Sequence, residues 1–345
     1  MRYLVTGVAG FIGSQVAERL LPRATELIGV DCFTANYPRA VKEENLRHLR
    51  PKPNFSLLEA DLGVADLPAI LSGVDVVVHQ AGLPGVRPSW GRGFSEYVAH
   101  NVVATQRLLE AARNVGVRRF VYASSSSVYG NAASYPTSEE AVPRPFSPYG
   151  VTKLAGEHLC GTYGANYGLS TVALRYFTVY GPRQRPDMAF HRFVEAGCRG
   201  TEINVYGSGE QVRDFTHVDD VVRANVLATE ADLPPGKVLN IAGGSRVDVN
   251  TVLTLLAGLV QTPLRVTRVD HQAGDVEETW ATCDEARRLL GWTPTVELVD
   301  GLASQVDWHR TRLEPVLAPT TNGNHDPDLS VVPAPAVRRP ANARG

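Results

Sequence analysis

The sequence predicts an α/β protein in which a doubly wound parallel sheet carries a smaller α/β lobe. Short runs of β-branched and apolar residues alternate with helical patterns through the first half of the chain, which is typical of parallel βαβ units. A glycine-rich turn joins the first expected strand to the first helix. The second half is less regular, so we expect a separate lobe there, with some segments returning to the first sheet.

The expected strands are short apolar runs, and the expected helices lie between them. Proline, asparagine and small residues dominate from about Pro315 onward, which is typical of a disordered tail. We therefore assign 1–176 to the sheet domain, 177–313 to the lobe and 314–345 to a disordered tail. The expected strands fall at 3–5, 27–30, 55–58, 74–78, 120–123, 172–177 and 238–241, and the later helices at 190–198, 218–228, 249–259 and 284–290.

The composition is that of an ordinary globular protein and argues against several classes of function. The 345 residues suffice for about two domains, and 43% of them are hydrophobic and 20% charged. A net charge of −2 without a basic block argues against a nucleic-acid partner. Four scattered cysteines without a C-x-x-C pair argue against zinc and disulfides and suit a reducing compartment. With no apolar run near ~20 residues and no room for a signal peptide, we expect a cytoplasmic protein without a metal or membrane anchor.

The first turn carries the spacing of a dinucleotide-binding loop. Gly7, Gly10 and Gly13 form G-x-x-G-x-x-G between a strand and a helix, where glycines permit a tight turn and a helix N-terminus attracts a pyrophosphate. The triplet alone is equally compatible with an ordinary strand-to-helix turn. Asp31 favours the dinucleotide, because it ends the second strand 18 residues after Gly13, where an acid accepts the ribose hydroxyls. A carboxylate there repels a 2′-phosphate, so the sequence predicts a Rossmann-like NAD site.

Further positions complete this expected site. Residues 61–62 follow a short strand and are placed to cap the adenine pocket, and 80–82 follow another strand, where small residues let backbone pass near the cofactor. Asn101 is either a contact of the cofactor or a hydrogen-bonding residue inside a helix, and we expect His79 to be a packed histidine. The expected cofactor-binding residues are Gly7, Gly10, Phe11, Ile12, Gly13, Asp31, Asp61, Leu62, Gln80, Ala81, Gly82, Asn101, Tyr149, Lys153 and Tyr176.

Tyr149 and Lys153 are the strongest candidates for chemistry. They stand four residues apart just after Ser147-Pro148, where a helix can begin, so they share one face of that helix. A nearby ammonium favours phenolate and lowers the tyrosine pKa from its ordinary value of about 10. A tyrosine tuned in this way can take a proton from an alcohol. By itself the pair is weak evidence, because tyrosine and lysine at this spacing mostly form an ordinary solvated helix face.

Several separate motifs resemble the extended short-chain dehydrogenase/reductase family. Besides the glycine loop, the acid and the Tyr-Lys pair, they lie at 124–130, 174–183, 212–220 and 274–276, and the likeness covers about residues 1–312. Within the family the chain is most similar to nucleotide-sugar 4-epimerases acting on UDP-glucuronate. The resemblance implies NAD as cofactor and Ser125, Tyr149 and Lys153 as the catalytic set.

Four positions bear on which sugar is bound. Dehydratases of the family carry Asp-Glu where this chain has Ser126 and Ser127, and serines cannot supply the acid-base chemistry of elimination. UDP-glucuronate decarboxylases typically carry Glu at the position of Ser127. Galactose epimerases usually show Asn and Arg where this chain has Thr178 and Gln272. These departures favour return of the hydride to the 4-keto intermediate, and UDP-glucuronate over UDP-glucose as the substrate.

Arg185 is the expected partner of a sugar carboxylate, because a guanidinium binds carboxylate through a bidentate fork. The alternative is a surface arginine in a proline-rich loop. Ser126, Ser127 and Thr178 could add neutral hydrogen-bond donors to the same carboxylate. By resemblance, Arg213 contacts the diphosphate, Asp275 lies near the uridine ribose, and 205–206 line the uracil pocket. The expected substrate-binding residues are Ser125, Ser126, Ser127, Thr178, Arg185, Val205, Tyr206, Arg213 and Asp275.

We therefore expect NAD-dependent 4-epimerisation of a UDP-sugar through a 4-keto intermediate, with UDP-glucuronate converted to UDP-galacturonate. The alternatives are a UDP-glucose 4-epimerase, a UDP-glucuronate decarboxylase, and an NAD-sensing protein without chemistry, which fold alone does not exclude. The resemblance also implies a homodimer that packs through helices at about 94–115 and 149–167.

Overall fold

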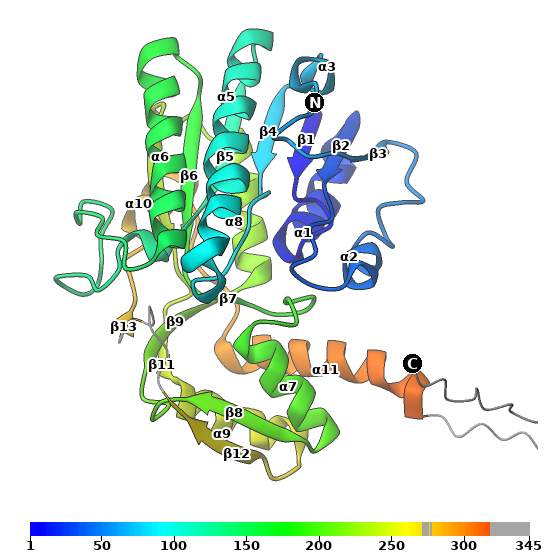
Figure 1. Ribbon diagram of the computed structural model, residues 1–345, viewed down its shortest axis with the longest axis vertical. Helices are drawn as coiled ribbons and strands as arrows, with labels where there is room; N and C mark the ends of the chain where they lie inside the picture. Colours follow the sequence, from blue (N-terminus) through cyan, green and yellow to red (C-terminus); the bar gives the residue numbers. More distant parts are fainter. Residues whose placement is uncertain (271–275, 277, 318–345) are drawn as a thin grey trace, which may run out of the picture.

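The computed structural model describes residues 1–270, 276 and 278–317, and its main body is a seven-stranded parallel sheet (Figure 1). The strand order β10-β6-β5-β4-β1-β2-β3 reverses direction between β1 and β4, as in a doubly wound fold. The predicted fold class is confirmed. The strands are β1 (Arg2–Thr6), β2 (Glu26–Asp31), β3 (Phe55–Glu59), β4 (Val76–His79), β5 (Arg119–Ser125), β6 (Thr171–Tyr176) and β10 (Lys237–Ile241).

Helices cover both faces of this sheet because the central strands are apolar on both sides, as parallel strands require. One face packs on α1 (Phe11–Leu20), α8 (Val218–Glu230) and α10 (Asp284–Leu290), and the other on α3 (Leu67–Leu71), α5 (Ala104–Val115) and α6 (Pro148–Tyr167). The remaining helical segments of this body are η1 (Leu21–Arg23), α2 (Arg39–Asn45), η2 (Arg87–Ser89), η3 (Gly91–Gly93), α4 (Phe94–Tyr97), the π-helical turn η4 (Val98–Val103) and η5 (Ser126–Val128).

The lobe lies beyond the carboxyl ends of the strands (Figure 1). Its core joins Phe190, Phe215 and Tyr180 with the apolar faces of three helices. The lobe contains β7 (Val179–Tyr180), β9 (Val212–His217), β11 (Ser245–Asp248) and β13 (Glu278–Thr279) in one sheet, β8 (Glu202–Tyr206) with β12 (Arg265–Val269) in another, and α7 (Ala189–Arg199), α9 (Val249–Val260) and α11 (Leu298–Leu317).

The chain crosses more than once between the two parts. Strand β10 returns from the range 177–313 to pair with β6, so the division at 176/177 stays a proposal. Most of the predicted tail, 318–345, lies outside the described residues, whereas 314–317 belong to α11. No helix in the described part of the chain is long and apolar enough to cross a membrane.

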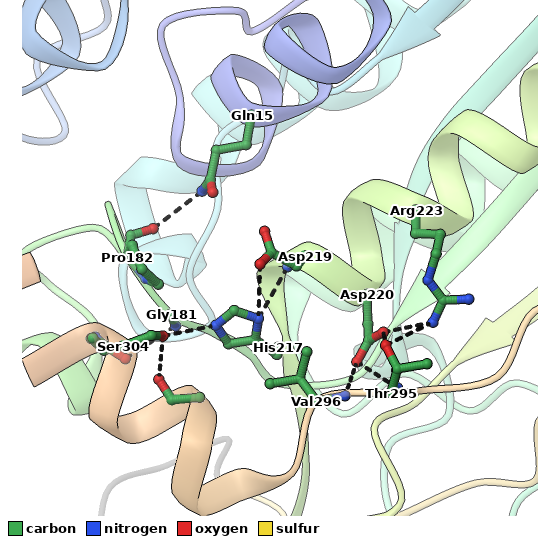
Figure 2. A network of polar contacts seen from close by, with 12 residues as sticks. Gln15, Gly181, Pro182, His217, Asp219, Asp220, Arg223, Thr295, Val296 and Ser304 are labelled. Carbon is green, nitrogen blue, oxygen red and sulfur yellow. Dashed lines mark hydrogen bonds and ion pairs between the residues drawn. The ribbon is translucent and has the colours of Figure 1, made fainter. Parts of the chain in front are cut away.

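Polar contacts join the lobe to the sheet domain (Figure 2). The Asp220 carboxylate on α8 accepts backbone N–H bonds from Thr295 and Val296 at 3.0 and 3.1 Å and pairs with Arg223 at 2.7 Å. Asp220 is 1% exposed, so these bonds satisfy a buried charge. The segment leading into α11 is thereby fixed against α8.

Candidate active site

A cleft opens at the carboxyl ends of β1, β2 and β4, where the strand order reverses and where doubly wound folds bind ligands. It encloses about 1090 Å³ of space that is open to solvent. The predicted cofactor residues that line it are Gly7, Gly10, Phe11, Ile12, Gly13, Asp31, Asp61, Leu62, Gln80, Ala81, Gly82, Tyr149, Lys153 and Tyr176.

The glycine loop has no room for side chains. Gly7 has φ +67, and a Cβ there would lie 2.7 Å from the backbone nitrogen of Ala81. A Cβ on Gly13 would lie 2.2 Å from the carbonyl oxygen of Gly7. Helix α1 begins after Gly10 without a side-chain cap, so its first N–H groups point at the cleft as an anion site.

Asp31 braces this loop as well as lining the cleft. Its carboxylate accepts N–H bonds from Ala9 at 3.0 Å and from Phe33 at 2.8 Å. Lys42 Nζ lies 4.0 Å from the Asp31 carboxylate and is itself buried and in the cleft wall. Burial lowers the pKa of Lys42, and Asp31 opposes that shift. Sequence reasoning missed Lys42, because no motif spacing links it to Asp31.

Asn101 is the one predicted cofactor residue that does not line the cleft. It lies in the π-helical turn η4, 1% exposed, and its amide bonds the backbone N–H and C=O of Leu83 at 2.7 and 3.0 Å and Thr152 Oγ1 at 3.0 Å. Its side chain therefore stabilises the cleft wall, as expected for a hydrogen-bonding residue inside a helix and not for a contact of the cofactor.

His79 is packed in the core of the sheet. Its ring nitrogens hydrogen-bond the Thr6 hydroxyl at 2.7 Å and the Thr105 hydroxyl at 2.9 Å. Burial, assisted by the Lys153 charge, lowers its pKa to about 3, so the ring is neutral. This arrangement is that of the packed histidine expected from the sequence.

Helix α6 brings the three predicted catalytic side chains together. Its N-cap Ser147 accepts the Gly150 N–H at 3.1 Å and Pro148 occupies the first turn, so the helix begins where the sequence predicts. Ser125 ends β5, and its hydroxyl acts to lower the pKa of the Tyr149 phenol. Lys153 Nζ donates to the Ala123 carbonyl at 2.9 Å.

The predicted effect of Lys153 on Tyr149 is wrong. Burial raises the pKa of Tyr149, and the groups that oppose this rise are Ser125 and Arg185. Lys153 is turned toward the Ala123 carbonyl and is 6% exposed, and burial lowers its own pKa to about 8. The cation that favours the Tyr149 phenolate is thus a guanidinium from another part of the chain.

Arg185 reaches this site from the segment between β7 and α7. It lines the same cleft as Tyr149 and Lys153. Its guanidinium forms a bidentate pair with Asp187, at 3.0 Å from Nε and 2.9 Å from Nη2. The alternative of an ordinary surface arginine does not describe it, because its side chain is only 17% exposed.

A second, smaller cavity encloses about 530 Å³. Arg213 in its wall donates to the carbonyls of Val212 at 2.9 Å and Val276 at 2.6 Å. The other predicted substrate residues that line this cavity are Ser126, Ser127 and Thr178.

Three other predicted substrate residues, Ser125, Val205 and Tyr206, line neither cavity. Val205 is 2% exposed and packs in the core of the lobe, so its side chain is not presented to a ligand. The Tyr206 ring lies under the Arg87 guanidinium at 4.0 Å. Asp275, like Gln272, lies outside the described residues.

Comparison with known proteins assigns the family. A model of the NAD dependent epimerase/dehydratase family matches residues 3–242, and the chain belongs to that family. It is 43% identical to a Bacillus subtilis protein named as an uncharacterized UDP-glucose epimerase, YtcB, over 89% of this chain and 97% of that one. It is 35% identical to the UDP-glucuronate 4-epimerase of Thermodesulfobacterium geofontis, over 90% and 97%.

Among solved structures it is similar to the UDP-glucuronic acid 4-epimerase of Bacillus cereus in complex with UDP-glucuronic acid and NAD. The identity is 41%, the TM-score 0.88, and the match covers 90% of this chain and all of the other.

Proposed function

We propose that this chain is an NAD-dependent UDP-glucuronate 4-epimerase that forms UDP-galacturonate through a 4-keto intermediate. The observation that carries the proposal is the meeting of Tyr149 and Arg185 in a cleft that begins at the dinucleotide loop. The Arg185 charge acts on the Tyr149 phenol. One guanidinium is therefore placed to bind a sugar carboxylate and to favour the base that deprotonates the sugar.

The residues present fit NAD. The glycine loop and the uncapped start of α1 suit a pyrophosphate, and Asp31 suits a ribose diol. When bound, NAD would supply the reversible hydride acceptor for C4 of the sugar. Lys153, facing the cleft beside Gly82, holds the nicotinamide ribose.

Tyr149 takes the proton of the 4-hydroxyl in this mechanism, and Ser125 shares the hydrogen bond. Because burial raises the pKa of Tyr149, the phenolate is a strong base whose formation depends on Ser125 and Arg185. Proton removal therefore requires both Ser125 and Arg185 to be in place beside Tyr149.

Arg185 also decides the fate of the keto intermediate. A β-keto acid loses carbon dioxide when its carboxylate aligns with the carbonyl π-system, and a bidentate guanidinium holds it in another orientation. Ser126, Ser127 and Thr178 supply neutral donors around the sugar. None of them supplies the acid-base pair that elimination requires.

Incubation with UDP-glucuronate, with the products separated by chromatography, tests this function. Formation of UDP-galacturonate supports it. UDP-xylose, or turnover of UDP-glucose alone, points to the decarboxylase or the glucose epimerase. Unchanged sugars together with bound NAD point to a sensing protein.

We also propose that residues 1–176 bind NAD, that 177–313 bind the nucleotide sugar, and that the chain forms a homodimer. Val103 on η4 and Val151 on α6 are 46% and 49% exposed, on the helices expected to pair. Val103→Glu with Val151→Glu should yield monomers in sedimentation equilibrium. Val299→Glu, at a 44% exposed valine of α11, is the matched control. The unpaired cysteines fit a cytoplasmic location, which stays a prediction.

A further inference from the structure

The loop that carries Arg185, residues 181–188, is anchored to helix α1 on one side. Gln15 Nε2 donates to the Pro182 carbonyl at 3.1 Å (Figure 2). Arg183 forms a bidentate pair with Glu18 at 2.9 and 3.1 Å. Arg183 has φ +67, a left-handed conformation that a non-glycine residue keeps only when its surroundings hold it there.

Gln184, directly before Arg185, anchors the loop to the lobe. It is 2% exposed, and its amide joins three elements. Its Nε2 donates to the Val179 carbonyl of β7 at 3.0 Å. Its Oε1 accepts the His191 N–H of α7 at 2.8 Å and the Gln305 amide of α11 at 3.0 Å. The position of the residue next to Arg185 therefore depends on the C-terminal helix.

Gln305 closes this arrangement from a distance in sequence. It is 0% exposed, does not line the cleft, and its Oε1 accepts the Gly181 N–H at 3.0 Å while its Nε2 binds Gln184. One amide thus holds the first residue of the loop and the residue before Arg185. In a dry environment only one orientation of the two amides satisfies these groups, which makes the arrangement specific.

We propose that Gln305 is a positioning residue for Arg185 and thereby sets the preference of the site for a sugar carboxylate over a neutral sugar. The inference rests on the proposed function, in which Arg185 binds that carboxylate. A bidentate contact needs its guanidinium placed within about 0.5 Å, so a loosened loop weakens it. A neutral hexose makes no such contact and does not depend on the loop in this way.

Binding measured in the Tyr149→Phe background tests the proposal, because the sugar then stays unchanged during titration. The full chain is loaded with NAD and titrated calorimetrically with UDP-glucuronate and, separately, with UDP-glucose. Gln305→Leu should weaken UDP-glucuronate about tenfold, or about 1.4 kcal/mol, and change UDP-glucose less than about twofold. An equal loss for both ligands, or no loss, overturns the proposal.

Ser304→Ala is the matched control. Ser304 precedes Gln305 on α11, but its hydroxyl contacts His217 at 3.2 Å and the Gly301 carbonyl at 2.8 Å instead of the loop (Figure 2). It should leave the ratio of the two affinities unchanged. A loss of preference in this variant equal to that in Gln305→Leu would show a general effect of α11 and overturn the assignment.

A double-mutant cycle separates positioning from a general structural effect. In the Arg185→Ala background Gln305→Leu should cost no further UDP-glucuronate affinity, because the group that it positions is gone. Full additivity would overturn the proposal. If Gln305→Leu does not fold, Gln184→Met removes the same amide hydrogen bond from the side of the loop. The same selective loss of UDP-glucuronate affinity is then expected.

The wild-type and Tyr149→Phe proteins distinguish a failure of the proposed function from a failure of the positioning role of Gln305. If the wild-type chain does not epimerise UDP-glucuronate and the Tyr149→Phe protein shows no preference for it, the proposed function fails and the inference fails with it. If the wild-type chain epimerises UDP-glucuronate and the Tyr149→Phe protein prefers it, but Gln305→Leu keeps that preference, only the positioning role of Gln305 fails.

Discussion

Glu157 lies one helical turn after Lys153 on α6 and forms a bidentate ion pair with Arg175 on β6, with N–O distances of 2.9 and 2.7 Å. The two residues are 6% and 4% exposed. Glu157 also accepts the Ser124 hydroxyl, and Arg175 donates to the Tyr129 hydroxyl at 2.7 Å. The pair therefore ties the helix that bears Tyr149 and Lys153 to the ends of β5 and β6.

Glu157→Gln should lower the free energy of unfolding by about 3–5 kcal/mol, because it leaves the Arg175 charge buried without a counter-ion. Urea denaturation followed by circular dichroism measures the loss. The double variant Glu157→Gln with Arg175→Met should recover most of it, since a neutral pair carries no such penalty. A double variant as unstable as the single one would show that the charge is not the cause.

Tyr149→Phe should keep NAD and nucleotide binding and lose about 10²–10⁴-fold in turnover, the usual contribution of a general base. Phenylalanine fills the same space, so the fold is preserved. Turnover is followed by chromatography of the UDP-sugars, and binding by calorimetry. Wild-type turnover in this variant would remove Tyr149 from the mechanism.

Arg185→Ala should reduce UDP-glucuronate turnover far more than the affinity for UDP, because UDP has no carboxylate for the guanidinium. Arg185→Lys keeps the charge without the fork and should recover only part of the activity. Released carbon dioxide, measured with labelled substrate, should rise in the alanine variant. Equal losses for UDP and for UDP-glucuronate would contradict the carboxylate role.

Gly13→Ala should weaken NAD binding, because its Cβ would lie 2.2 Å from the Gly7 carbonyl and force the loop open. NAD affinity measured by fluorescence quenching reports the effect. Gly258→Ala on α9 is the control, since its Cβ would meet no atom within 4 Å. That variant should bind NAD normally and gain about 0.5–1 kcal/mol of stability from the better helix former. Normal NAD affinity in Gly13→Ala would contradict the role of the loop.

His79 should make the protein less stable in acid. Its folded pKa of about 3 lies below the ordinary value of 6.5, so between these values the unfolded chain binds a proton that the folded protein does not. The stabilisation is present above pH ~6.5 and falls as the pH decreases, by about 2 kcal/mol at pH 5. His79→Gln should show a smaller fall in urea midpoints between pH 7.5 and 5.

The exposed His48 supplies the control for this measurement. His48→Gln makes the same replacement at an exposed position and shows what a change of histidine to glutamine does outside the core. Identical slopes for wild type and His79→Gln would show that other groups cause the loss of stability in acid.

Local patterns predicted the elements because each depends on residues that are neighbours in the chain. The run from Val74 to Val78 is apolar at every position except Asp75, and it overlaps β4. Ser147-Pro148 marks the start of α6. The cofactor loop could be found for the same reason, since Gly7 and Gly13 belong to one turn. Lys42 could not, because only the return of the chain through α2 brings it beside Asp31.

The sequence by itself determined the doubly wound fold, the dinucleotide loop and the Tyr149–Lys153 pair, because short-range periodicity and spacing encode all three. The tertiary structure alone decided that Arg185, and not Lys153, favours the Tyr149 phenolate. It also decided that Gln305 reaches Gln184 across 121 positions of the chain. Burial and contacts between distant segments set these relationships, and neither follows from spacing along the chain.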